Sequence, residues 1–216
     1  MKNIIGVLLA VVLAFPAMAQ KDLNDPKAID ILKKISQKYG AYSTMQVDFV
    51  QSIKGIETGA TEEKKGTIYI KGDMYRLETK EFDRICDNKL IWDFMKGAGE
   101  VHIKSIDEEM TDIQPSKIFS LYDQNYTSLY ISEGNAKGKK IHVIDLTPND
   151  KSMPFFKVRM AIEQGSNDVL EFKVFYGEGF QISYLLENFK KNPTLADSKF
   201  SFNKANHPGI VEVDLR

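Results

Sequence analysis

The stretch Phe156–Glu163, FKVRMAIE, decides the fold class of this 216-residue chain. Apolar side chains stand at every second position, and charged or small side chains fill the positions between them. An alternation with a period of two is typical of a β-strand that buries one face. Leu170–Phe175 and Phe180–Glu187 repeat the pattern after Gly-containing turns. This part of the chain therefore predicts antiparallel hairpins with one apolar face.

Shorter stretches with a strand pattern precede these hairpins. They lie at residues 45–50, 68–70, 74–78, 84–86, 90–94, 100–106, 126–132 and 139–147, with a charged loop at 55–65. A flat sheet of about ten antiparallel strands would expose its apolar face and its edges, so it has to curl. We therefore predict a mainly β (α+β) fold with one domain, residues 20–216. A single curved antiparallel sheet would form an incomplete β-barrel covered by short helices.

The predicted helices are few and short. The first begins at Pro26, with Asp25 as its N-cap, and ends at Gly40. Its apolar side chains recur at spacings of three and four, at Ala28, Ile29, Leu32, Ile35 and Tyr39. Such a helix either packs one face on the sheet or forms a mobile lid over a pocket. A second helix is predicted at Gln114–Tyr122, with Ile118, Phe119 and Tyr122 on its apolar side.

Residues 1–19 have the features of a signal peptide. Lys2 precedes an uncharged apolar run, Ile4–Phe15, and Ala17-Met18-Ala19 matches a cleavage site. The run is too short for a membrane anchor, which takes roughly 20 apolar residues. We expect cleavage after Ala19 and export to a bacterial periplasm. The single cysteine, Cys86, cannot form an internal disulfide and is expected to fill a buried position.

The composition and motifs point away from nucleic acids and catalysis. The chain has 29 Lys and Arg against 30 Asp and Glu, so it lacks the basic surface of a nucleic-acid binder. His102, His142 and His207 are isolated from one another and match no metal-site spacing. Asp48 and Asp93 would be the acids worth testing in an enzyme. We expect neither enzyme activity nor a metal or cofactor.

A strongly apolar sheet face next to amphipathic helices suggests a container for lipid. Apolar residues of matching parity would line the cavity and bind acyl chains, while the helices could equally fill the space as a dry core. The predicted cavity residues are Phe49, Ile68, Ile70, Leu77, Trp92, Phe94, Val101, Ile103, Phe156, Val158, Met160, Phe172 and Ile182. Leu32 and Ile35 would contribute from the first helix.

Several stretches, in this order, resemble the LolA family of periplasmic lipoprotein carriers. Ser43–Gln51 looks like the family's first strand, and Gly66–Lys71 is similar to its second. Cys86–Phe94 resembles its Asp-Gly-Lys-x-x-Trp hairpin, with Asn88 in place of Gly. Leu195–Phe202 and His207–Asp214 are similar to its closing strands. The order of these stretches along nearly the whole chain after residue 19 carries the resemblance.

The resemblance implies a monomeric carrier without a cofactor. It would bind the acyl chains of lipoproteins at an inner-membrane release complex and pass them to an outer-membrane receptor. One stretch departs from the family, because Lys71-Gly72-Asp73 stands where Arg-Pro is usual and the arginine helps to hold the lid closed. Arg76 could replace that arginine or could be a solvated strand residue. The departure leaves open a paralogue that carries another lipid or one with a looser lid. A competing interpretation is a periplasmic sensor module that uses the same fold to bind a protein rather than a lipid.

Overall fold

The computed structural model describes residues 24–55, 59, 61–106, 117–119, 125–177 and 179–216. The predicted signal peptide lies outside these residues. The elements are α1 (Pro26–Gly40), β1 (Thr44–Gly55), β2 (Thr61–Lys71), β3 (Met74–Thr79), β4 (Phe82–Cys86), β5 (Leu90–Met95), β6 (Glu100–Ser105), β7 (Tyr126–Ala136), β8 (Lys139–Pro148), β9 (Phe155–Glu163), β10 (Val169–Tyr176), β11 (Phe180–Lys191), the 3-10 turns η3 (Asp197–Phe200) and η4 (Lys204–Asn206), and β12 (Val211–Asp214).

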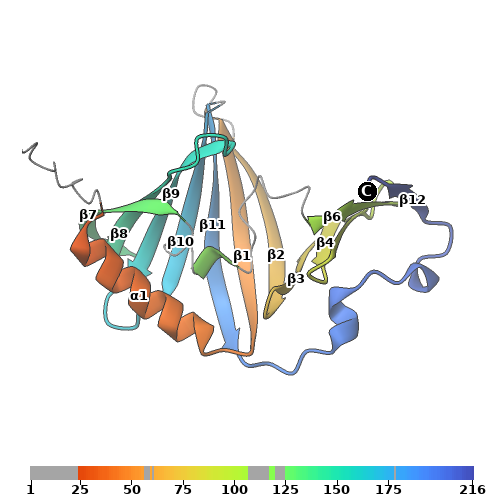
Figure 1. Ribbon diagram of the computed structural model, residues 1–216, viewed down its shortest axis with the longest axis horizontal. Coiled ribbons are helices and arrows are strands. Elements are labelled where there is room, and N and C mark those ends of the chain that lie inside the picture. The colour runs from red at the N-terminus through yellow and green to blue at the C-terminus, as the bar shows by residue number, and fades with distance from the viewer. Residues whose placement is uncertain (1–23, 56–58, 60, 107–116, 120–124, 178) are drawn as a thin grey trace, which may run out of the picture.

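All twelve described strands form one sheet, in the order β12-β6-β5-β4-β3-β2-β1-β11-β10-β9-β8-β7. Its outermost strands, β12 and β7, do not pair with each other, so the curved sheet stays open (Figure 1). This confirms the predicted incomplete barrel. The prediction of purely antiparallel pairing misses one contact, because β12 runs parallel to β6.

The helix α1 lies across β7 to β10 on one face of the sheet, which we call the inner face (Figure 1). The carboxylate of Asp25 accepts a hydrogen bond from the backbone N–H of Lys27 at 2.8 Å, as expected of an N-cap. The buried side of α1 includes Leu32 and Ile35, and Ile31 takes the buried position that was expected for Ile29. The Tyr39 hydroxyl accepts a hydrogen bond from the Val169 N–H at 3.1 Å. The helix therefore packs on the sheet along its whole length.

Two sequence predictions need adjustment. The charged loop expected at 55–65 is shorter, because β2 begins at Thr61 and its charged residues pair with β1, as in Ile53 with Glu62. Those side chains remain in water while the backbone completes the ladder. Of the helix predicted at 114–122, only Lys117–Phe119 lies within the described residues, where it forms a 3-10 turn.

The chain after β11 crosses to the opposite face, the outer face, of β3 to β6 (Figure 1). Phe200 in η3 is only 1% exposed. The Phe94 ring lies 5.5 Å from the Phe202 ring and 4.6 Å from the His207 ring, measured between centroids. One sheet thus has two apolar cores, one on the inner face beneath α1 and one on the outer face beneath the C-terminal segment.

Candidate functional site

An apolar cavity opens on the inner face, between the middle of the sheet and the turn Lys117–Phe119. It contains about 670 Å³ of space outside protein atoms, part of which is open to solvent. Its lining comprises Val47, Phe49, Ile68, Ile70, Leu77, Ile118, Phe119, Phe172, Val174, Tyr176, Tyr184 and Leu186.

The strand register explains why these side chains meet. Directly paired residues on neighbouring strands point to the same face. Ile68 pairs with Val47 on one side and with Leu77 on the other, so β1, β2 and β3 contribute to one wall. Tyr184 pairs with Phe172, and their rings stack with centroids 4.6 Å apart. The wall is therefore continuous across β1, β11 and β10.

Gly66 gives the ring of Phe49 its place in the cavity. A Cβ atom at this position would lie 2.5 Å from Phe49 Cζ and 2.4 Å from the backbone oxygen of Glu78. No side chain other than hydrogen fits there without a shift of the ring or the strands. The glycine thus allows an aromatic side chain to lie flat against the sheet at the cavity wall.

The turn Lys117–Phe119, which we call the roof segment, covers the cavity. Ile118 is 4% exposed and Phe119 is 7% exposed. The Phe119 ring stacks on the Tyr39 ring of α1, with centroids 3.9 Å apart. Lys117 forms an ion pair with Asp73 in the turn between β2 and β3. The roof segment is therefore attached to α1 at one side and to the sheet at the other.

The sequence matches the model of one protein family, described as the outer membrane lipoprotein carrier protein LolA, over residues 41–203. The chain belongs to the LolA family. No protein with a curated description matches it. The structure resembles an uncharacterized conserved protein from Thermus thermophilus, with a TM-score of 0.56, 12% identity, and coverage of 87% of this chain and 99% of that chain.

The fold also resembles the Mycobacterium tuberculosis lipoprotein LppX, with a TM-score of 0.52 and 11% identity. The match covers 80% of this chain and 99% of LppX. At these identities the two structures show the fold alone. Together with the family match, they agree with a divergent LolA-like chain.

Five predicted cavity residues line the cavity of this LolA family member: Phe49, Ile68, Ile70, Leu77 and Phe172. Val158 and Met160 face the same side but are buried in the core beneath α1, where Leu32 and Ile35 join them. Ile182 shares the face, since it pairs with Val174, but lies outside the lining. Acyl-chain binding by these residues remains a prediction.

Four predicted cavity residues, Trp92, Phe94, Val101 and Ile103, lie on the outer face, and their assignment was wrong. Leu77 faces the cavity and pairs with Arg84, which in turn pairs with Asp93. Trp92 and Phe94 flank Asp93 in β5 and so point the other way. Their partners Ile103 and Val101 share that outer face. The C-terminal segment explains why these positions are apolar, since Phe202 covers Phe94 there.

Phe156 also lies outside the cavity, with 51% of its surface exposed. The register between β9 and β10 shifts at this point, so that Tyr176 pairs with Phe155. Phe155 takes the buried position and is only 2% exposed. A β-bulge moves the following or preceding side chain to the other face, which explains the wrong assignment.

The lining includes residues that the prediction omitted, namely Val47, Val174, Tyr176, Tyr184 and Leu186. A signal for four of them was present, since Val47 and Val174 continue the alternation of Phe49 and Phe172, and Tyr184 and Leu186 continue that of Ile182. Tyr176 falls in a predicted turn. The roof residues Ile118 and Phe119 were expected on the apolar side of a helix, and they reach the cavity from a single 3-10 turn.

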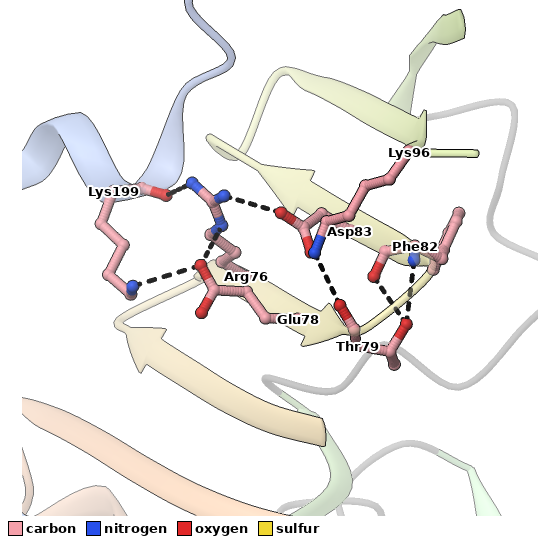
Figure 2. Close-up of polar contacts among 7 residues, drawn as sticks. All are labelled: Arg76, Glu78, Thr79, Phe82, Asp83, Lys96 and Lys199. Atoms are coloured by element: carbon pink, nitrogen blue, oxygen red, sulfur yellow. Dashed lines mark hydrogen bonds and ion pairs between the residues drawn. The ribbon is translucent and has the colours of Figure 1, made fainter. Parts of the chain in front are cut away.

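The Arg76 guanidinium forms ion pairs with two carboxylates, and neither of them lies on α1. Its Nη2 atom lies 2.7 Å from Asp83 Oδ2, and its Nε atom lies 2.7 Å from Glu78 Oε1 (Figure 2). Its Nη1 donates to the backbone oxygen of Lys199 in η3 at 3.4 Å. Neither expectation for Arg76 therefore holds, because its guanidinium is held in ion pairs rather than solvated, and the backbone oxygen that it reaches belongs to η3 of the C-terminal segment rather than to a lid.

The acids considered for catalysis are held in structural contacts. Burial raises the pKa of Asp93, but hydrogen bonds and charges from Arg84 and Lys104 outweigh it and keep the pKa below its ordinary value. Asp48 accepts hydrogen bonds from Thr67 and Asn188. Burial raises the pKa of the Cys86 thiol, which is fully enclosed. These environments favour a stable ion pair and an unreactive thiol.

The described part of the chain holds no group of three or more His, Cys, Asp or Glu able to bind a metal ion. Within the same residues, no helix is long and apolar enough to cross a membrane.

Proposed function

We propose that the protein is a periplasmic carrier that binds the acyl chains of lipoproteins in this cavity and shuttles them from the inner to the outer membrane. It would act without catalysis or a cofactor, as a chaperone for lipid-modified cargo. The observation that carries the proposal is the apolar cavity on the inner face, enclosed by the roof segment. The LolA family match supports the same class of ligand.

The composition of the lining suits an acyl chain. Each methylene group transferred from water into such a site gains about 0.8 kcal/mol. The cavity wall is formed by aliphatic and aromatic side chains from five strands. The lining residues include no cationic side chain that could pair with a carboxylate or phosphate, so the bound part of the ligand is its hydrocarbon chain.

The attachment of the roof segment suits a site that loads and releases its ligand. Lys117 and Asp73 are 38% and 50% exposed, and ion pairs of that exposure contribute only about 0–1 kcal/mol. The aromatic stack with Tyr39 adds roughly 0.5–1.5 kcal/mol beyond buried area. The roof segment pairs with none of the described strands, so displacing it would expose Ile118 and Phe119 but leave the sheet ladder intact.

Native mass spectrometry of residues 20–216 tests the proposal. The protein would be titrated with a triacylated lipopeptide and, separately, with the same peptide without acyl chains. We expect a one-to-one complex with the acylated form alone. Binding of neither form would contradict the carrier function and favour a protein-binding sensor module.

Export is tested separately. In a Gram-negative host, the proposal expects the periplasmic fraction to contain a chain that begins at Gln20. Recovery of the intact 216-residue chain from the cytoplasm would contradict export.

A further inference from the structure

The strands β10 and β11 separate below their paired region. They pair from Phe175 with Gln181 to Glu171 with Leu185. β11 continues to Lys191. Its lower part, Leu186–Lys191, pairs with β1 on the other side, as in Glu187 with Asp48. Figure 1 shows β11 extending well past the lower end of β10. Among the described strands, none pairs with this lower part on the β10 side.

A groove occupies the fork between the two strands. It holds about 1690 Å³ of space outside protein atoms, including open solvent. Leu185–Phe189 form one side, and Asp168–Glu171 lie at the other. The turn after β7 contributes Lys137, which forms an ion pair with Glu187 at 2.6 Å. Leu186 lines both this groove and the apolar cavity, so the two spaces meet at one side chain.

The open strand edge determines which ligand fits the groove. In an antiparallel pair, alternate residues direct their N–H and C=O groups to one neighbour and the others to the opposite side. The pairing of β11 with β1 shifts register between Glu187 and Lys190, at a bulge where Asn188 has a φ of 49°, so this alternation is interrupted there. On the β10 side, the backbone groups of Leu186–Phe189 have no ladder partner among the described strands. An acyl chain cannot satisfy these groups, whereas an extended polypeptide can form the missing ladder.

The charges around the groove are already paired, which disfavours a strongly charged ligand. Lys139 lies 2.8 Å from Glu163, and Lys38 lies 2.5 Å from Asp168. With Lys137 and Glu187 also paired, recognition here would depend on backbone hydrogen bonds and on apolar contacts with Leu170, Leu185 and Phe189. Such recognition tolerates many peptide sequences.

We propose that this groove binds the polypeptide of an acylated cargo, as an extended strand added to the lower edge of β11. The acyl chains would lie in the adjoining cavity, with Leu186 at the junction. The inference rests on the proposed function and adds to it a second contact, made by the protein part of the cargo.

Hydrogen exchange of residues 186–189 tests the inference in the chain that lacks residues 1–19. Three probes would be compared: a triacylated lipopeptide with about six peptide residues, the usual length of a strand, the same lipopeptide N-methylated at every backbone amide, and palmitate. We expect the first to slow exchange about tenfold or more, because an added strand protects the amides. The N-methylated form and palmitate should leave exchange unchanged.

The outcomes separate the two proposals. Binding of the lipopeptide without protection of residues 186–189 would overturn the groove assignment and leave the carrier function standing. Equal protection by palmitate would assign the groove to acyl chains and would likewise overturn its assignment to the polypeptide of the cargo. Failure of all three probes to bind would contradict the carrier function itself.

A variant pair provides an independent readout. Leu170→Trp fills the groove at a position outside the cavity lining, whereas Ser183→Trp places the same side chain on β11 in neither space. Leu170→Trp should lower the affinity for the lipopeptide about tenfold but leave the affinity for its acylated cysteine, tested without the peptide, unchanged. Ser183→Trp should change neither affinity. Equal effects of the two variants on the affinities for the lipopeptide and for the acylated cysteine would contradict the inference.

Discussion

The inner face of β1 to β3, β10 and β11 differs from the outer face of β4 to β6, although the same alternating pattern produces both. On the inner face, apolar side chains such as Leu77 and Phe172 border a cavity. On the outer face, Phe94 and Val101 pack under the C-terminal segment. The comparison shows that alternation specifies a buried face, but the segment that covers this face decides between a ligand site and a core.

The largest expected effect comes from the outer core. Phe200→Ala removes a ring that is only 1% exposed, and such truncations cost about 3–5 kcal/mol. Urea unfolding should show this loss. In conditions where the variant is folded, its affinity for the lipopeptide should equal that of the wild type. Lost affinity with unchanged stability would contradict the division between the two faces.

Gly66→Ala should disturb the inner face with a smaller loss of stability. The new methyl group would meet the Phe49 ring and the backbone of β3, and overpacking of this kind costs about 1–3 kcal/mol. Because Phe49 lines the cavity, lipopeptide affinity should fall as well. Gly97→Ala is the matched control, since a Cβ there meets nothing within 4 Å. Equal behaviour of the two variants would argue against a crowded cavity wall.

The ion pairs of Asp93 predict a loss of stability in acid. Its pKa is lower in the folded protein than the ordinary 3.8, so the ionised form stabilises the fold above that value. This contribution is lost as pH falls through the lower folded pKa. Urea unfolding between about pH 7 and pH 2 should show a shallower decline for Asp93→Asn than for the wild type. Parallel curves would show that Asp93 has no such role.

The smallest effect on stability is expected at the roof segment. Lys117→Gln removes the ion pair with Asp73 and should change the free energy of unfolding by about 1 kcal/mol or less. The lipopeptide should nevertheless dissociate faster, because the roof segment loses its contact with the β2–β3 turn. Stopped-flow dissociation measures this rate. Lys204→Gln, which breaks an exposed pair with Glu212, should leave the rate unchanged.

Local features of the chain were predictable because their causes are local. Asp25 and Pro26 mark the start of α1, and period-two alternation marks nearly every strand of the sheet. The face of Trp92 was not predictable, since it depends on the C-terminal segment, which lies about one hundred residues further along the chain. Phe156 was misplaced by a register shift that alternation cannot reveal. The contact of Lys117 with Asp73 likewise depends on the tertiary fold.

The single tryptophan of the chain allows the most direct test of where acyl chains bind. Trp92 lies on the outer face, while Phe172 lines the cavity. A lipopeptide with brominated acyl chains quenches tryptophans that it contacts. We predict that it leaves Trp92 fluorescence unchanged in the wild type and quenches the double variant Trp92→Phe, Phe172→Trp. Quenching of Trp92 without quenching of the double variant would contradict an acyl-chain site on the inner face.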